Sequence, residues 1–143
     1  MHLGVQGGII RALYTAHNGV YRMSADMEDL VETSNNIARV VIKDGEIMIG
    51  CLTRSSVETS KFDLANALRS AFELTGCEVN LSGSYPGWTP NVKSEILDVL
   101  VPIYEKQTGE KPSVVACHAG LECGILGTNY PKMDMISFGP TIH

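Results

Sequence analysis

The fold of the first half of the chain is decided by residues 36–54, which read Asn-Ile-Ala-Arg-Val-Val-Ile-Lys-Asp-Gly-Glu-Ile-Met-Ile-Gly-Cys-Leu-Thr-Arg. Residues 36–43 are rich in β-branched side chains, which favour strands. The dipeptide Asp44-Gly45 follows, and it tolerates the two positive φ angles that a tight hairpin turn requires. Residues 46–54 then return with alternating apolar side chains, as a partner strand does. These residues therefore predict a β-hairpin.

Further elements are predicted on both sides of the hairpin. A helix is expected over residues 9–16 and a short strand over residues 20–23. A second helix follows the hairpin, because Ser55 and Glu58 have the spacing of a capping box. Its apolar stripe, at three- and four-residue steps, comprises Leu64, Leu68, Ala71 and Leu74. Alternating apolar and polar residues over 77–82 predict a half-buried strand.

This order of elements indicates a fold class. Helix, strand, hairpin, helix and strand make the split βαβ, or ferredoxin-like, pattern without its first strand. The first strand is therefore expected to be absent from this chain. We predict an α+β fold for residues 1–84.

The second half of the chain begins after a break in the pattern. Two prolines and a glycine within residues 85–90 cannot continue a helix or strand, so residues 85–92 are interpreted as a boundary loop. Residues 93–143 are interpreted as an α-β-α-β piece of an α/β layer. Its predicted elements are a helix over 94–108, a strand over 112–117, a helix over 119–126 and a strand over 133–138. Pro102 predicts either a kink in the first of these helices or two shorter helices.

Composition excludes several classes of protein. The chain has 143 residues, of which 44% are hydrophobic and 19% charged, as in one ordinary globular domain. It carries 11 Lys and Arg against 16 Asp and Glu, and this net charge of −5 argues against a nonspecific nucleic-acid binder. No apolar run approaches the ~20 residues of a membrane span. With four cysteines and no signal-peptide pattern, we expect a reduced, cytoplasmic protein.

Reactive side chains are densest in residues 117–124, Cys-His-Ala-Gly-Leu-Glu-Cys-Gly. Their spacing matches no standard zinc pattern, so we interpret them as a strand-turn-helix junction in which Gly120 and Gly124 allow close backbone approach. Arg54 can present a planar fork to a carboxylate, although a solvated surface arginine is the simpler interpretation. Residues 35–36, both Asn, fit a turn before the hairpin better than a ligand site. Taken alone, the residues indicate no complete active site.

Several segments together resemble a known family. The most specific are Tyr-Pro-Gly-Trp at 85–88 and His-Ala-Gly-Leu-Glu-Cys-Gly at 118–124. The other matching segments are residues 18–24, 30–36, 53–56, 89–91 and 133–142. In this order they resemble the aminoacyl-histidine dipeptidases, also called Xaa-His dipeptidases, of the zinc aminopeptidase and carboxypeptidase superfamily.

The resemblance implies a larger enzyme than this chain. Such dipeptidases have a catalytic domain that binds two zinc ions and a lid domain inserted into it. The chain resembles the later part of the lid followed by part of the catalytic domain. The family's metal ligands and catalytic Glu are not among its residues, and His143 precedes the family's last metal histidine. We therefore expect this chain to bind no zinc, to supply no catalytic residue and to be inactive alone.

The resemblance also implies substrate contacts. Arg54 stands where the family's lid arginine binds the C-terminal carboxylate of a dipeptide, and Asn36 matches a lid position that contacts the substrate backbone. Gly120 and Glu122 lie in the segment that matches the substrate-lining loop. In the intact family, two zinc ions would generate hydroxide and polarise the peptide carbonyl while a Glu acts as general base.

Two alternatives stay open at this point. Besides a dipeptidase segment, the chain is either a noncatalytic ferredoxin-like module for ligand binding or dimerisation, or a small zinc protein that uses Cys117, His118 and Cys123. The zinc protein is the least favoured, because it requires tight, stoichiometric metal. An absent first strand would leave a sheet edge open, through which a homodimer can form.

Overall fold

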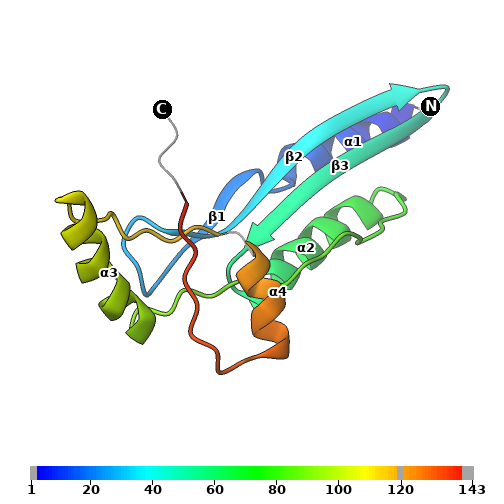
Figure 1. Cartoon of the computed structure of the whole chain (residues 1–143). Helices are drawn as coiled ribbons and strands as arrows, with labels where there is room; N and C mark the ends of the chain where they lie inside the picture. The colour runs from blue at the N-terminus through cyan, green and yellow to red at the C-terminus, as the bar shows by residue number, and fades with distance from the viewer. Residues whose placement is uncertain (1–2, 119–120, 140–143) are drawn as a thin grey trace.

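The computed structural model describes residues 3–118 and 121–139. Its helices and strands follow in the order α1 (Leu3–Thr15), β1 (Gly19–Met23), β2 (Val31–Lys43), β3 (Glu46–Ser55), α2 (Glu58–Glu73), α3 (Glu95–Thr108) and α4 (Leu121–Asn129). The strands form one antiparallel sheet in the order β1-β2-β3. Figure 1 shows α3 apart from this sheet, while α1 and α2 run along the β2–β3 hairpin. The predicted α+β class is confirmed.

The predicted hairpin is confirmed. Strands β2 and β3 pair from Lys43↔Glu46 at the turn to Thr33↔Ser55 at the open end. Asp44 and Gly45 have φ angles of 54° and 85°, as the tight turn requires. Strand β2 begins at Val31 rather than at residue 36. The prediction of a turn at residues 35–36 is therefore wrong, because β1 pairs with this polar part of β2 and extends the strand.

The core lies between α1, α2 and one face of the hairpin. Its buried side chains are Ala12, Ala16, Leu64, Leu68 and Phe72, with Ile37 and Ile49 of the sheet packed against them. Leu74, predicted to join this stripe, is 89% exposed. That expectation is wrong because α2 ends at Glu73 and the chain then turns away, with the Thr75 amide bonded to the Phe72 carbonyl. Helix α1 also begins earlier than predicted, at Leu3.

The capping box predicted for α2 is wrong. The residue that precedes the helix is Val57, whose side chain makes no capping hydrogen bond. Ser55 instead ends β3, and its Oγ lies 2.8 Å from Thr33 Oγ1 and accepts from the Val57 amide at 3.0 Å. Glu58 Oε2 is occupied by Lys61 Nζ at 2.8 Å. Ser55 therefore lies two residues before the N-cap position, too early in the sequence to cap α2.

Three predicted strands are absent from the described structure. Residues 77–82, 112–117 and 133–138 carry no regular secondary structure. Cys77 and Val79 do pack against the core, as the alternation predicted, whereas Leu81 is 41% exposed. A strand also needs a neighbour for its backbone groups. In the split βαβ arrangement that neighbour is the first strand, which none of the described residues provides.

The second half begins with α3, whose predicted ends are confirmed. Ser94 Oγ accepts from the Leu97 amide, and Gly109 is left-handed with a φ of 76°. The helix runs through Pro102 as one element. The carboxylate of Asp134, far along the chain, accepts from Ser94 Oγ at 2.8 Å and from the Ile96 amide at 3.1 Å. This carboxylate ties the last described segment to the start of α3.

Helix α4 is shifted along the sequence relative to the prediction. It runs from Leu121 to Asn129, and residues 119–120, where its start was predicted, lie outside the described residues. Within the described part of the chain, no helix is both long and apolar enough to cross a membrane.

Candidate carboxylate-binding site

Two of the predicted substrate contacts lie on one face of the hairpin. Ser34 pairs with Arg54, and the neighbouring pair is Asn36 with Leu52. Cross-strand partners project from the same face, and side chains two residues apart share that face. Arg54 and Asn36 are therefore diagonal neighbours, both exposed, on the face opposite to Ile37 and the core. The sequence resemblance named both residues, and the strand register places them together.

His118 joins this face from the other half of the chain. Its Nε2 lies 2.9 Å from Ser34 Oγ, a hydrogen bond across 84 positions of sequence. Partial burial lowers the pKa of His118, and the nearby charge of Arg54 lowers it further. The imidazole is therefore mostly neutral at pH 7, with its Nε2 either donating to or accepting from the serine hydroxyl. Sequence reasoning missed this contact, because no local pattern relates position 34 to position 118.

Two glycines set the distance between the halves. A Cβ on Gly124 of α4 would lie 2.7 Å from the Pro86 carbonyl oxygen. A Cβ on Gly87 would lie 2.7 Å from the Ser56 carbonyl oxygen and 2.8 Å from that of Ser55. Side chains do not reach such distances from backbone oxygens, so α4, the 85–90 loop and the end of β3 stack in a way that only glycine allows. The predicted close approach at Gly124 is confirmed, and it holds the start of α4 near the end of β3 that carries Arg54.

Hydrogen bonds fasten the same loop to α2. Lys61 is a buried charge whose Nζ donates to the Tyr85 carbonyl at 2.7 Å and to Glu58 Oε2 at 2.8 Å. The Gly87 amide also donates to Glu58 Oε2, at 3.2 Å. Burial acts to raise the pKa of Glu58, but the hydrogen bonds from Lys61 and Gly87 outweigh it and lower the pKa. The carboxylate is therefore ionised and holds the loop in place at neutral pH.

On the inner face, buried polar groups support the open end of the hairpin. Asn35 Nδ2 donates to the His17 carbonyl at 2.8 Å, and Thr53 Oγ1 donates to Asn35 Oδ1 at 3.0 Å. Thr33 is fully buried and Asn35 is 2% exposed. Buried polar groups must be paired, so this network specifies the register that places Ser34 opposite Arg54.

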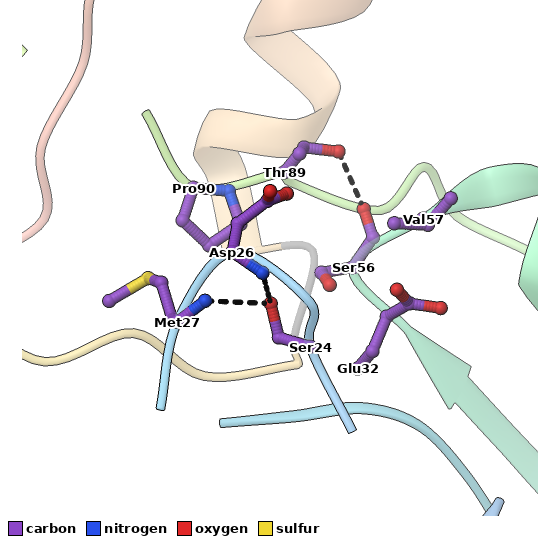
Figure 2. A pocket seen from close by; sticks show the side chains of 8 residues that line it. All are labelled: Ser24, Asp26, Met27, Glu32, Ser56, Val57, Thr89 and Pro90. Carbon is purple, nitrogen blue, oxygen red and sulfur yellow. Dashed lines mark hydrogen bonds between the residues drawn. The ribbon is translucent and has the colours of Figure 1, made fainter. Parts of the chain in front are cut away.

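A small polar cavity lies behind the site, and Figure 2 shows it. Its volume is about 20 Å³, which suits one water molecule and no substrate. Its lining residues are Ser24, Asp26, Met27, Glu32, Ser56, Val57, Thr89 and Pro90. Ser24 Oγ accepts from the amides of Asp26 and Met27, and Thr89 Oγ1 donates to the Ser56 carbonyl at 2.9 Å. The Thr89 bond joins the 85–90 loop to the residue that follows β3, whereas the Ser24 bonds stay within residues 24–27.

The remaining predicted positions contribute less to the described site. Glu122 is exposed in the first turn of α4, and Gly120 lies outside the described residues. Cys117 is exposed and Cys123 is half-buried. Across residues 3–118 and 121–139, no three His, Cys, Asp or Glu side chains gather as metal ligands would. The alternative zinc site at Cys117, His118 and Cys123 is therefore not formed, and His118 is bonded to Ser34 instead.

Comparison with known proteins agrees with the resemblance found in the sequence. Over 133 residues the chain is 38% identical to the cytosol non-specific dipeptidase of Escherichia coli (strain K12), a match that covers 93% of this chain and 27% of that relative. A crystal structure of aminoacylhistidine dipeptidase from Vibrio alginolyticus matches with a TM-score of 0.88 and 41% identity, over 98% of this chain and 29% of that one. No family model matches the chain. The predicted resemblance to aminoacyl-histidine dipeptidases is confirmed, and the chain spans less than a third of these relatives.

Proposed function

Because this chain corresponds to one segment of the dipeptidases it matches, we propose that it is part of a zinc-dependent dipeptidase that hydrolyses Xaa-His and other dipeptides. In this proposal residues 1–84 belong to the lid, residues 85–92 form the boundary loop and residues 93–143 belong to the catalytic domain. The word cytosol in the name of the Escherichia coli relative supports a cytoplasmic location.

The proposal rests on the exposed face that carries Arg54. The guanidinium of Arg54 binds the C-terminal carboxylate of the dipeptide, and the amide of Asn36 contacts the substrate backbone. Two salt bridges are found within the described ranges, Arg22–Glu32 and Lys61–Glu58, and neither of them uses Arg54. A planar guanidinium without such a partner suits two parallel hydrogen bonds to a carboxylate. Gly120 and Glu122 are proposed to line the same substrate.

The zinc ions of the proposed enzyme do not fit the residues of this chain. A dizinc centre needs several His, Asp and Glu side chains around each ion, and the described residues hold no group of even three. The metal would therefore be held by other parts of the longer protein. This chain's residues bind and orient the dipeptide, and lid closure over the substrate would exclude water. We propose that the chain alone is inactive.

Two measurements on the 143-residue chain test this function. In the first, glycylhistidine is incubated with the chain and added zinc, and we expect no hydrolysis; turnover would show that the chain holds a complete active site. In the second, glycylglycine is titrated into Arg54→Gln and into Arg39→Gln, a matched exposed arginine of β2. Loss of one bidentate ion pair should weaken binding about tenfold or more in the Arg54 variant only. Equal affinity of the two variants would contradict the proposed role of Arg54.

The outer edge of β3 supports a further proposal about partners. The sheet order leaves this edge unpaired among the described strands, and an open edge can pair with another chain. We propose that the isolated chain forms a homodimer through it. Sedimentation at increasing concentration should show a dimer, and a Leu52→Pro variant on the edge strand should weaken it. A single monomeric species at high concentration would exclude this association.

A further inference from the structure

The ring of His118 lies beside Arg54, on the face of the hairpin that carries Ser34. His118 Nε2 is 2.9 Å from Ser34 Oγ, and Ser34 is the cross-strand partner of Arg54. Partner side chains on one face have Cβ atoms roughly 4.5–5.5 Å apart. The charge of Arg54 also perturbs the titration of His118, as expected of two neighbouring groups. The imidazole and the guanidinium thus flank the same small area of the sheet.

This pair of side chains is electrostatically unbalanced within the described structure. Protonated His118 and Arg54 would repel each other, and Arg54 is in neither of the two salt bridges found there. Other charged groups nearby are already engaged or lie on the His118 segment itself. Glu32, two residues before Ser34 in β2, has its Oε1 3.8 Å from Arg22 Nη1, and Glu122 is exposed at the start of α4. An anion between the imidazole and the guanidinium would remove the repulsion.

The chemistry of the two groups favours a carboxylate over other anions. Arginine binds the two oxygens of a carboxylate with a planar fork, and a histidine N–H supplies a further donor to one oxygen. The Ser34 hydroxyl holds the ring at Nε2, so that the imidazole orientation is set before the ligand arrives. Prepositioned donors lose less freedom on binding than mobile ones.

We infer that His118 and Arg54 bind one carboxylate together, so that His118 is a second residue for the C-terminal carboxylate of the dipeptide. This inference rests on the proposed function and adds a contact from the second half of the chain to the one made by Arg54. The substrate carboxylate would therefore bridge the two halves of the chain at the point where Ser34 and His118 already meet. Binding of a carboxylate and protonation of His118 would favour each other, because the two equilibria share one coupling free energy.

The test uses the 143-residue chain with histidines labelled with ¹⁵N, and two probes that differ only in the carboxylate. Glycylglycine should shift the ring signals of His118, whereas glycylglycinamide should not. His118→Phe, which removes the ring donors and retains an aromatic side chain, should weaken glycylglycine binding about tenfold, while His118→Asn, which retains a donor, should recover part of the affinity. Affinity in the original chain should rise as the pH falls through the titration of His118, and this pH dependence should vanish in both variants.

The outcomes separate this inference from the proposed function. If His118→Phe binds glycylglycine as tightly as the original chain and with the same pH dependence, while Arg54→Gln binds it about tenfold or more weakly, the role of His118 is wrong and the function stands. If the two probes bind equally, or if Arg54→Gln binds like Arg39→Gln, the function fails as well. If the amide spectrum of His118→Phe loses its dispersion, that variant is unfolded, and the glycylglycine affinity and pH dependence are measured on His118→Asn instead. An unchanged pH dependence in that variant overturns the inference.

Discussion

The close approach of α4 to the 85–90 loop makes a prediction whose sign depends on the structure. In an exposed helix, replacing glycine by alanine stabilises by up to about 1 kcal/mol, because alanine is the better helix former. At Gly124 the added Cβ would lie 2.7 Å from the Pro86 carbonyl oxygen and 3.2 Å from that of Gly87. Both neighbours are backbone atoms, so they cannot rotate away as a flexible side chain does.

Two effects of opposite sign must therefore be compared in Gly124→Ala. Overpacking of a close contact costs about 1–3 kcal/mol. The gain in helix propensity offsets at most about 1 kcal/mol of that cost. We expect the free energy of unfolding to fall by about 1–2 kcal/mol, and the Ser34–His118 hydrogen bond to be weakened as α4 moves away from the loop.

Gly127, in the same helix, provides the matched control. Its added Cβ would meet only Met135 Cε, the flexible end of a side chain, at 3.4 Å. Gly127→Ala should therefore raise the free energy of unfolding by a few tenths of a kcal/mol to about 1 kcal/mol. Urea denaturation followed by circular dichroism measures both variants under the same conditions. If Gly124→Ala stabilises the chain as much as Gly127→Ala does, the stacking of α4 on the loop is refuted.

Three further predictions concern the core, the hairpin and the start of α3. Leu64 is fully buried, so Leu64→Ala should lower the free energy of unfolding by about 2–5 kcal/mol in a urea titration. Leu74 is 89% exposed, so Leu74→Ala should change it by less than about 0.5 kcal/mol in the same titration. Thr33→Val should lower the free energy of unfolding by about 1–3 kcal/mol, because it leaves the buried Ser55 hydroxyl without its cross-strand partner. If a double-mutant cycle with Ser55→Ala gives an interaction energy of zero, this hydrogen bond does not contribute to stability. Hydrogen bonds hold the pKa of Asp134 below its usual value of 3.8, so its contribution to stability is present above that pH and is lost as the pH falls through the lowered pKa. Asp134→Asn should remove this part of the acid dependence, and identical acid titrations of the two chains would disprove the link.

Several elements in both halves of the chain could be predicted from local patterns. The Asp44-Gly45 turn, the two strands around it and the left-handed Gly109 after α3 all depend on the conformational preferences of residues close together in the sequence. The same preferences misplaced Ser55, because α2 begins at Glu58 after the N-cap Val57. Ser55 therefore ends β3, where its hydroxyl bonds to Thr33 across the sheet and accepts from the Val57 amide. The helical spacing of apolar residues wrongly predicted that Leu74 is buried. Helix α2 ends at Glu73, so Leu74 lies beyond the part of the helix that packs on the core.

The strands predicted over 77–82, 112–117 and 133–138 show a different failure. Alternation and β-branched residues report which side chains favour burial, and Cys77 and Val79 are indeed packed on the core. They do not supply the neighbouring backbone that completes a sheet. Helix α3 likewise has an apolar stripe, but none of its residues is buried.

The candidate site divides along the same line. The resemblance of short segments to the aminoacyl-histidine dipeptidases singled out Arg54, Asn36, Gly120 and Glu122, whereas their residue types alone favoured a surface arginine, a turn and a strand-turn-helix junction. Only the tertiary structure decided that Arg54 and Asn36 share a face and that His118 reaches that face through Ser34. The physical reason is that strand register and the backbone contacts at Gly87 and Gly124 are set by packing between segments far apart in sequence.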